Sequence, residues 1–475
     1  MSDEKVISDL PVENINPANH VFEPAGVKAS DSFEISEDGT ITYYAGTETT
    51  ITIPKEIRGI AVLAIGKYGL SGKKLTRDTE KFSEIPWNVV RENRLVEAVI
   101  PDSVTTIGAD AFSYNQLKKI VIPDSVTEIG HYAFSYNQLT TVVIPNSVTK
   151  IATGVFRGNK LTNVVIPDSI TEIGIFAFYG NSLTELIIPN SVTKICEGAF
   201  YENKLTSIII PDSITKIDDS VFCKNQLTKI IIPDSITKIG HYAFSDNQLA
   251  EVVIPDSVTV IGQSAFFGNR LTEIIIPHSV TVICPSAFVG NQLTNIVIPD
   301  SVKKIYQEVF SWNQLTEIAI PNSVTEIEFY AFAHNQLAKV IIPDSVTKIG
   351  RSAFFCNRLV EIIIPNSITE IGVSVFRNNR LAKVVIPNSV KKINRKAFFK
   401  NQLTSIIIPE SVTQIGRFAF ANNPLTSITI LGKVSLPRKN PVFDNGFDDF
   451  YRNNKKKAGI YVFDGTNWEY KELNK

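Results

Sequence analysis

The stretch IPDSITKIGHYAFSDNQL, residues 232–249, decides the fold because closely similar phrases return along most of the chain. It contains Ser235, His241 and Asp246, the residue types of a catalytic triad, in which a carboxylate orients a histidine that deprotonates a serine. In the related phrases, such as IPNSVTEIEFYAFAHNQL from Ile320, the position of His241 is taken by many other residue types. We therefore interpret the stretch as one unit of a repeat and not as a hydrolase site.

Prolines mark the period of this repeat. They recur every 22 residues from Pro101 to Pro409, which makes fifteen units without a break in register. A chain of 475 residues is usually divided into two or three globular domains, but a fixed period of this length indicates one elongated array. The sequence therefore predicts a β-rich solenoid, a leucine-rich repeat array of about fifteen 22-residue coils.

Each unit combines a strand with a turn. In LTSIIIPDSITKIDDSVFCKNQ, residues 205–226, the leucine and two isoleucines before Pro211 follow an L-x-x-L-x-L pattern and are expected to point inward. Proline has no N–H group and ends the strand in every coil. We expect these strands to form a continuous parallel sheet on the concave face, followed by a turn in which the side-chain oxygens of Asp212 and Ser213 accept hydrogen bonds from backbone N–H groups.

Two further positions recur in all fifteen units. Phenylalanine recurs from Phe112 to Phe420, which predicts a buried phenylalanine spine along the array. Asparagine recurs from Asn115 to Asn423, and its amide is suited to bonding backbone groups of adjacent coils.

These motifs resemble the BspA-like surface-antigen class of leucine-rich repeats, whose units read L-x-x-I-x-I-P-x-S-V-T-x-I-G-x-x-A-F. The resemblance covers about residues 95–430, and the segment TITYYAGTETTITIPKEIRGIAVLAIGKYGL resembles the N-terminal cap of that family. It implies an arc-shaped, non-enzymatic solenoid that binds proteins or host surfaces, often in bacterial adhesins, at the cell surface or after secretion. The polar start shows no apolar run of signal-peptide length and no wall anchor follows, so cytoplasmic location and leaderless export stay open.

The ends of the array depart from the repeat, as the ends of a solenoid must to cover its open edges. A hairpin is expected to turn at Asp38-Gly39, a degenerate unit lies at Pro54, and an insertion is expected in residues 72–87. A short helix and a hairpin turning at Asp464-Gly465 are expected at the other end. The predicted segments are a flexible start, an N-terminal cap, the solenoid and a C-terminal cap, at residues 1–30, 31–94, 95–430 and 431–475.

Composition excludes several classes of function. The net charge of −1 gives no general attraction to nucleic acid, and no apolar stretch is long enough to span a membrane. The four cysteines are expected to be free thiols, and the scattered histidines predict neither a metal site nor a cofactor. Residues 351–400 carry ten Lys or Arg against two Glu. This stretch is either a solvated rim or a site for anionic glycans, wall polymers or nucleic acid, although aromatic residues interleaved as in single-strand binders are not evident.

Strand alternation predicts the binding surface. The residue two before each proline must point outward, and it is valine or isoleucine in every unit except that of Ala319. At about 40 Å² per side chain this stripe exposes roughly 600 Å², at or above the largest apolar patch expected on a monomer. Two residues earlier the type varies strongly, as at the rim of an interface. The predicted site spans residues 229–363, with Ile231, Val253, Ile275 and Val297 as anchors and Glu251, Glu273 and Glu317 as selectors.

Two non-enzymatic functions follow from this surface. The first is a binding scaffold for a protein or a surface glycan, which contacts its partner through the concave sheet. The alternative is a structural or self-assembling solenoid without a dedicated ligand, in which copies associate through the apolar stripe. An enzyme is not expected, because no group of residues in the repeat supports chemistry.

Overall fold

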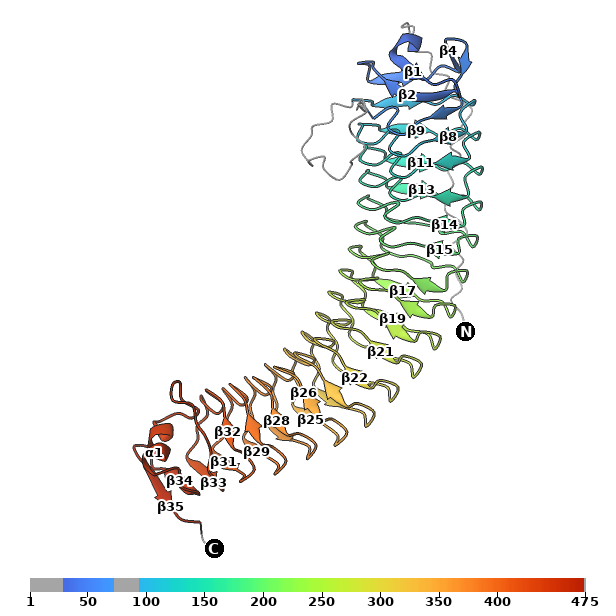
Figure 1. Ribbon diagram of the computed structural model, residues 1–475. Coiled ribbons are helices and arrows are strands. Elements are labelled where there is room, and N and C mark those ends of the chain that lie inside the picture. Colours follow the sequence, from blue (N-terminus) through green and yellow to red (C-terminus); the bar gives the residue numbers. More distant parts are fainter. Residues whose placement is uncertain (1–28, 72–93, 474–475) are drawn as a thin grey trace.

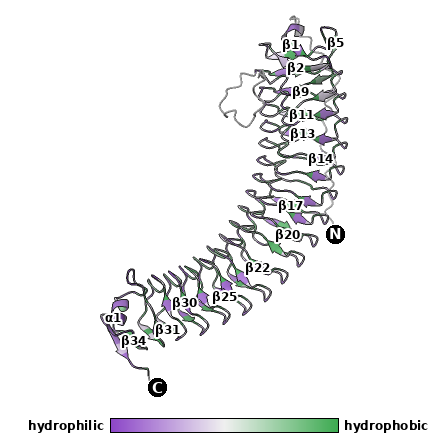
Figure 2. Ribbon diagram, viewed as in Figure 1, coloured by the Kyte–Doolittle hydropathy of each residue, from purple (hydrophilic) through white to green (hydrophobic). Residues whose placement is uncertain are grey.

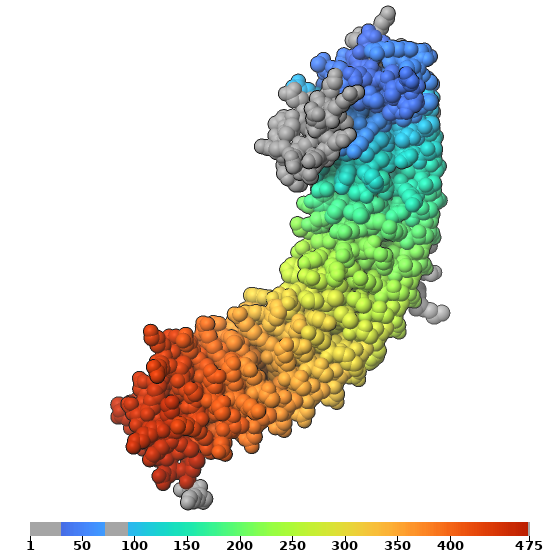
Figure 3. Space-filling view, in the orientation of Figure 1, coloured from blue at the N-terminus to red at the C-terminus, as the bar shows by residue number. Residues whose placement is uncertain are grey.

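The computed structural model describes residues 29–71 and 94–473, which form a single arc of stacked coils (Figure 1, Figure 3). The prediction of a β-rich leucine-rich repeat solenoid is confirmed: coils of 22 residues stack with parallel strands in register, as Lys229 pairs with Glu251. The insertion predicted in residues 72–87 lies outside the described residues, as does nearly all of the N-terminal segment 1–30.

The strands before the prolines form the first ladder. Its strands pair in parallel but only in short pieces, joined in places by single bridges such as Ile275 with Val297. The predicted continuous sheet is therefore wrong: each proline removes an N–H group, so that the paired segment is only three or four residues long and is easily interrupted. The strands are β3 (Thr50–Thr52), β7 (Glu97–Val99), β9 (Lys119–Val121), β11 (Thr141–Val143), β13 (Asn163–Val165), β17 (Lys229–Ile231), β19 (Glu251–Val253), β23 (Glu317–Ala319), β25 (Lys339–Ile341), β27 (Glu361–Ile363), β29 (Lys383–Val385), β31 (Ser405–Ile408) and β33 (Ser427–Ile430).

A second ladder of two-residue strands follows the prolines, and the sequence did not predict it. Each strand exposes or half-exposes its first residue and, from β8 onward, buries an isoleucine as its second, for example Lys216 and Ile217 in β16. The strands are β6 (Ala64–Ile65), β8 (Thr106–Ile107), β10 (Glu128–Ile129), β12 (Lys150–Ile151), β14 (Glu172–Ile173), β15 (Lys194–Ile195), β16 (Lys216–Ile217), β18 (Lys238–Ile239), β20 (Val260–Ile261), β21 (Val282–Ile283), β22 (Lys304–Ile305), β24 (Glu326–Ile327), β26 (Lys348–Ile349), β28 (Glu370–Ile371), β30 (Lys392–Ile393) and β32 (Gln414–Ile415).

One hydrophobic core runs through the whole stack. Figure 2 shows apolar and polar residues alternating around the coils. The core contains the predicted phenylalanine spine: neighbouring rings stack with their centroids 5.2–5.9 Å apart from Phe112 to Phe420, and Phe443 of the C-terminal cap extends the column by one ring. Because each coil is too small to bury its own apolar side chains, stacking is what supplies a core.

Buried asparagines tie each coil to the one before it, as predicted. The amide oxygen of Asn225 accepts a hydrogen bond from the N–H of Leu205 at 3.0 Å. Its amide nitrogen donates to the carbonyl of Phe200 in the preceding coil at 2.9 Å and to that of Phe222 in its own coil at 3.2 Å. One side chain thus satisfies three backbone groups that the core hides from water.

The serine two residues after the proline acts differently from the prediction in ten coils, whereas the hydroxyls of the other five have no hydrogen-bond partner among the described residues. The hydroxyl of Ser213 donates to the carbonyl of Val192 in the preceding coil at 2.6 Å, and Ser235 does the same toward Ile214 at 2.6 Å. The hydroxyl is therefore a donor between coils and not an acceptor within its own turn. A hydroxyl can play either part, so the residue type alone does not decide between them.

Both ends of the stack are capped. The expected hairpin is formed by β1 (Phe33–Ile35) and β2 (Thr40–Tyr44), after a short 3-10 helix (Ala29–Ser32) and beside the small pair β4 (Glu56–Ile57) and β5 (Ile60–Ala61). At the other end the expected helix and hairpin are α1 (Phe447–Asn453), β34 (Gly459–Phe463) and β35 (Trp468–Lys471). Strand β34 pairs antiparallel with β33 and so covers the last edge of the first ladder.

Candidate functional site

The apolar stripe consists of the fifteen residues that lie two before each proline, from Val99 to Ile407. The alternation that predicted it is confirmed, because these residues are exposed while their neighbours on either side are buried. Exposure is high in six consecutive coils, from Ile187 to Val297, where each side chain is 73–82% exposed, and again at Ile363, which is 80% exposed. The stripe ends in threonine at both caps, at Thr52 and Thr429, which pair with Val99 and Ile407.

The four predicted anchors lie side by side in the first ladder. Ile231 pairs with Val253 between β17 and β19, and single parallel bridges join Val253 to Ile275 and Ile275 to Val297. Since paired residues of a parallel ladder project on the same side, the four side chains form one uninterrupted apolar row.

The predicted selectors form a charged rim beside this row. Glu251 pairs with Lys229 and Glu317 pairs with Lys339, and Glu273 lies in the coil after Glu251, so an acidic stretch of the rim has a lysine at each end. All three glutamates are exposed. An exposed charge beside an apolar row is the arrangement found at the polar rim of protein interfaces.

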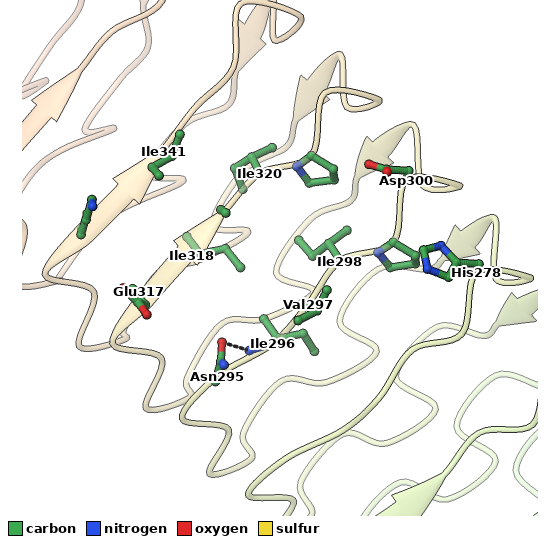
Figure 4. A pocket seen from close by; sticks show the side chains of 14 residues that line it. His278, Asn295, Ile296, Val297, Ile298, Asp300, Glu317, Ile318, Ile320 and Ile341 are labelled. Carbon is green, nitrogen blue, oxygen red and sulfur yellow. Dashed lines mark hydrogen bonds between the residues drawn. The ribbon is translucent and has the colours of Figure 1, made fainter.

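The stripe has a dip at its one small residue. Ala319 lies between Val297 and Ile341, and the missing side-chain volume contributes to a hollow of about 480 Å³ that Glu317 and Lys339 also line (Figure 4). Asn295 borders the same hollow and is held by a hydrogen bond from the N–H of Ile296 to its side-chain oxygen at 2.7 Å (Figure 4).

A second hollow of about 600 Å³ adjoins the first along the stripe. It is lined by Ile275, Val297, His278 and Asp256, and it shares Val297 and His278 with the first hollow. Two of the four anchors and one of the three selectors therefore line the hollows, whereas the others extend the same columns toward the N-terminus. The sequence already contained the signal for the dip, because Ala319 is the only stripe residue that is neither valine nor isoleucine.

The residues that suggest a triad are not brought together. Nδ1 of His241 accepts a hydrogen bond from the N–H of Gln263 at 2.8 Å, and the backbone N–H of His241 donates to Asp219 at 2.7 Å. The hydroxyl of Ser235 is used between coils, as described above. These hydrogen bonds join neighbouring coils, so His241 helps to hold the coils together.

Aromatic and basic side chains do interleave in the basic stretch 351–400, against the expectation from the sequence. The guanidinium of Arg377 lies 5.1 Å from the ring centre of Phe355 and 5.5 Å from that of Phe399. These half-buried rings are therefore partly covered by the protein's own cation, which limits their use as stacking surfaces for bases.

A curved stack of 22-residue coils, each with an inward L-x-x-I-x-I strand, defines a leucine-rich repeat solenoid. The family profile described as BspA type Leucine rich repeat region (6 copies) matches residues 83–201, 171–292, 281–402 and 370–470. The chain belongs to this family, whose members are generally protein-binding scaffolds. No curated protein matches the chain.

Several solved structures are similar to this chain. A leucine rich cell surface protein from Faecalibacterium prausnitzii is 28% identical, with 84% of this chain and 93% of that one covered and a TM-score of 0.36. A leucine-rich repeat protein from Bacteroides ovatus is 20% identical, with 93% and 97% covered and a TM-score of 0.41. One from Eubacterium ventriosum is 23% identical, with 87% and 95% covered and a TM-score of 0.39. In the described part of this chain, no helix has the length and apolar character needed to cross a membrane.

Proposed function

We propose that this protein is a non-enzymatic, adhesin-like scaffold that holds a partner protein against the apolar stripe between residues 229 and 363. The observation that carries the proposal is the exposure of branched aliphatic side chains in six consecutive coils, from Ile187 to Val297. Apolar surface of this extent on a soluble chain typically belongs to an interaction site.

The shape and charge of the surface support a protein as the partner. The hollow at Ala319 is large enough to take an apolar side chain, and aromatic or aliphatic anchors in such hollows supply most of the affinity of protein interfaces. The charged side chains of Lys229, Glu251, Glu317 and Lys339 supply a rim that would select among partners by charge.

The test is a double substitution in the stripe, Val253→Lys with Ile275→Lys. Both side chains are exposed, so the fold should survive and thermal melts should match the wild type. The matched control is Val121→Lys with Val143→Lys, which changes the same column outside the proposed site. Proteins retained by the immobilised chain from host and bacterial lysates should be lost with the first pair and kept with the second. Identical retention by both variants and by the wild type would move the site away from residues 229–363.

A second copy of the chain is the competing occupant of the stripe, since it carries the same apolar row. Sedimentation velocity of the purified protein distinguishes the two cases. A monomer that binds a foreign protein supports the scaffold, whereas a dimer that the Val253→Lys and Ile275→Lys pair converts to monomer would identify a self-assembling solenoid instead.

A further inference from the structure

Another column of the stack lies apart from the apolar stripe, and its residue type varies from coil to coil. It consists of the residues that follow each spine phenylalanine by two, and we call it the turn column. In five consecutive coils it reads Asp246, Gly268, Gly290, Trp312 and His334. The two coils that carry glycine therefore have no side chain at this position. The coil before them carries the carboxylate of Asp246 there, and the coil after them carries the indole of Trp312.

Trp312 presents one free face toward the glycines. Its ring is 59% exposed and stacks on His334 of the following coil, with the ring centres 3.8 Å apart and the planes 9° from parallel. Because this stack runs along the axis of the solenoid, the opposite face of the indole looks toward Gly290 in the preceding coil. Burial lowers the pKa of His334, so the ring behind Trp312 is neutral at neutral pH.

The space in front of this face is open. A Cβ atom built on Gly290 would meet only backbone atoms of Gly268, at 3.7 and 3.8 Å. A Cβ atom on Gly268 would lie 2.9 Å from Oδ1 of Asp246, so this carboxylate leans over Gly268. We call the space between Asp246 and Trp312 the tryptophan shelf.

The coil spacing sets the size of the shelf. The spine rings of the coils that carry Gly268, Gly290 and Trp312 follow one another at 5.6 and 5.9 Å. One flat ring stacked on Trp312 therefore fits above Gly290, and the carboxylate of Asp246, which leans over Gly268, lies one coil further from Trp312.

A second pair of glycines in the same column leaves a similar gap without a tryptophan beside it. Gly158 and Gly180 also follow one another, and the ring of Tyr136 lies 2.7 Å from the Cβ position of Gly158, whereas the Cβ position of Gly180 meets only backbone atoms of Gly158. The next coil carries Glu202 in this column, so no indole faces that gap. The backbone conformation does not require glycine at these places, since Trp312 and His334 both adopt a φ of 57°.

Polar side chains border the tryptophan shelf. Arg270, Gln292 and Gln314 follow the turn column by two residues in their coils, and all three are exposed. Asp246 forms no ion pair with any residue in the described part of the chain, and its recorded side-chain partner is the hydroxyl of Ser245 at 3.1 Å. The shelf therefore combines one flat apolar wall, one acceptor and a rim of amide and guanidinium donors.

We propose that the tryptophan shelf binds one pyranose ring of a carbohydrate chain, with the C–H face of the sugar stacked on Trp312 and hydroxyls at its edge bonded by the exposed side chains of Gln292 and Gln314. A pyranose has an apolar face and a polar edge, which matches an aromatic wall with a few placed hydrogen-bonding groups around it. The site is separate from the apolar stripe and does not depend on the function proposed for it.

The experiment is a titration of the full chain with soluble cello-oligosaccharides, N-acetylated chito-oligosaccharides and their deacetylated forms, followed by calorimetry and tryptophan fluorescence. At least one probe should bind and change the fluorescence. Trp312→Ala should weaken binding at least about tenfold. Binding of the deacetylated probes alone would identify an amino sugar as the bound ring, whereas binding of the neutral probes identifies recognition through hydroxyl groups.

Gly290→His is the decisive variant because it leaves Trp312 in place and covers its free face, as His334 covers the other. It should abolish binding, while Gly180→His, the same change in the same column away from the tryptophan, should leave binding as in the wild type. Thermal melts check that both variants are folded. The proposal is overturned if none of the probes binds, or if Gly290→His binds as tightly as the wild type.

Discussion

Replacing Asn225 with alanine should destabilise the stack by roughly 1–3 kcal/mol. The side chain satisfies three backbone groups, the N–H of Leu205 and the carbonyls of Phe200 and Phe222, at 2.9–3.2 Å. Asn225 is itself buried, so water cannot replace it without opening the coil. The two carbonyls keep a second donor, because Asn203 also donates to Phe200 and Asn247 to Phe222. The variant therefore leaves only the N–H of Leu205 without a partner, and one such buried group costs about 1–3 kcal/mol.

Hydrogen exchange is the assay that separates this effect from a general loss of stability. In a solenoid each coil contacts only its neighbours, so the weakened protection should centre on Leu205 and its adjacent coils and leave distant ones such as that of Leu381 unchanged. The control is Asn295→Ala, because that exposed asparagine bonds only the neighbouring N–H of Ile296. Equal exchange and equal melts for the two variants would refute the assignment of Asn225 as a link between coils.

Three further outcomes are expected. Phe244→Ala should cost about 3–5 kcal/mol, since it opens a cavity in the spine, whereas His241→Ala should cost about 1 kcal/mol or less; equal thermal melts would contradict these roles. Burial raises the pKa of the Cys223 thiol to about 11. At pH 8 iodoacetamide should therefore label this thiol slowly in the native chain and rapidly in denaturant. Fast labelling of the native chain would argue against a packed site. Lys194 lowers the pKa of Glu172 below its ordinary value of 4.5, so their ion pair contributes stability above pH 4.5 that is lost as the pH falls through the lowered pKa. Glu172→Gln should therefore lower the free energy of unfolding by less than about 1 kcal/mol at pH 7 and should not change it at pH 2. A difference between variant and wild type that persists in acid would disprove the linkage.

Most of the fold follows from the sequence because the period fixes the register. Once Pro101 and its successors set coils of 22 residues, every residue lies beside its equivalent in the next coil, and a column of phenylalanines or asparagines becomes a physical stack. The exposure of Val253 followed in the same way from alternation within a strand of three residues.

The features that the sequence did not predict depend on contacts that leave no periodic pattern in the sequence. A strand of two residues such as Lys216–Ile217 has too little alternation to be recognised, and the direction of the Ser213 hydrogen bond depends on which backbone group comes within reach. The dip at Ala319 and the free face of Trp312 are properties of neighbouring coils taken together. They become visible only when each residue is compared with those before and after it in its column.

Comparison within columns explains why two candidate sites can share one scaffold. In a regular stack every coil offers the same backbone and nearly the same core, so a surface feature can arise only where a side chain departs from its column. Ala319 departs in the apolar stripe, and Gly268 and Gly290 leave a gap beside Trp312 in the variable turn column, while the spine phenylalanines and the asparagines of the same coils are unchanged. Each site is thus built from exposed side chains on an unaltered coil. Substitutions that remove one site should therefore leave the coil, and with it the other site, intact.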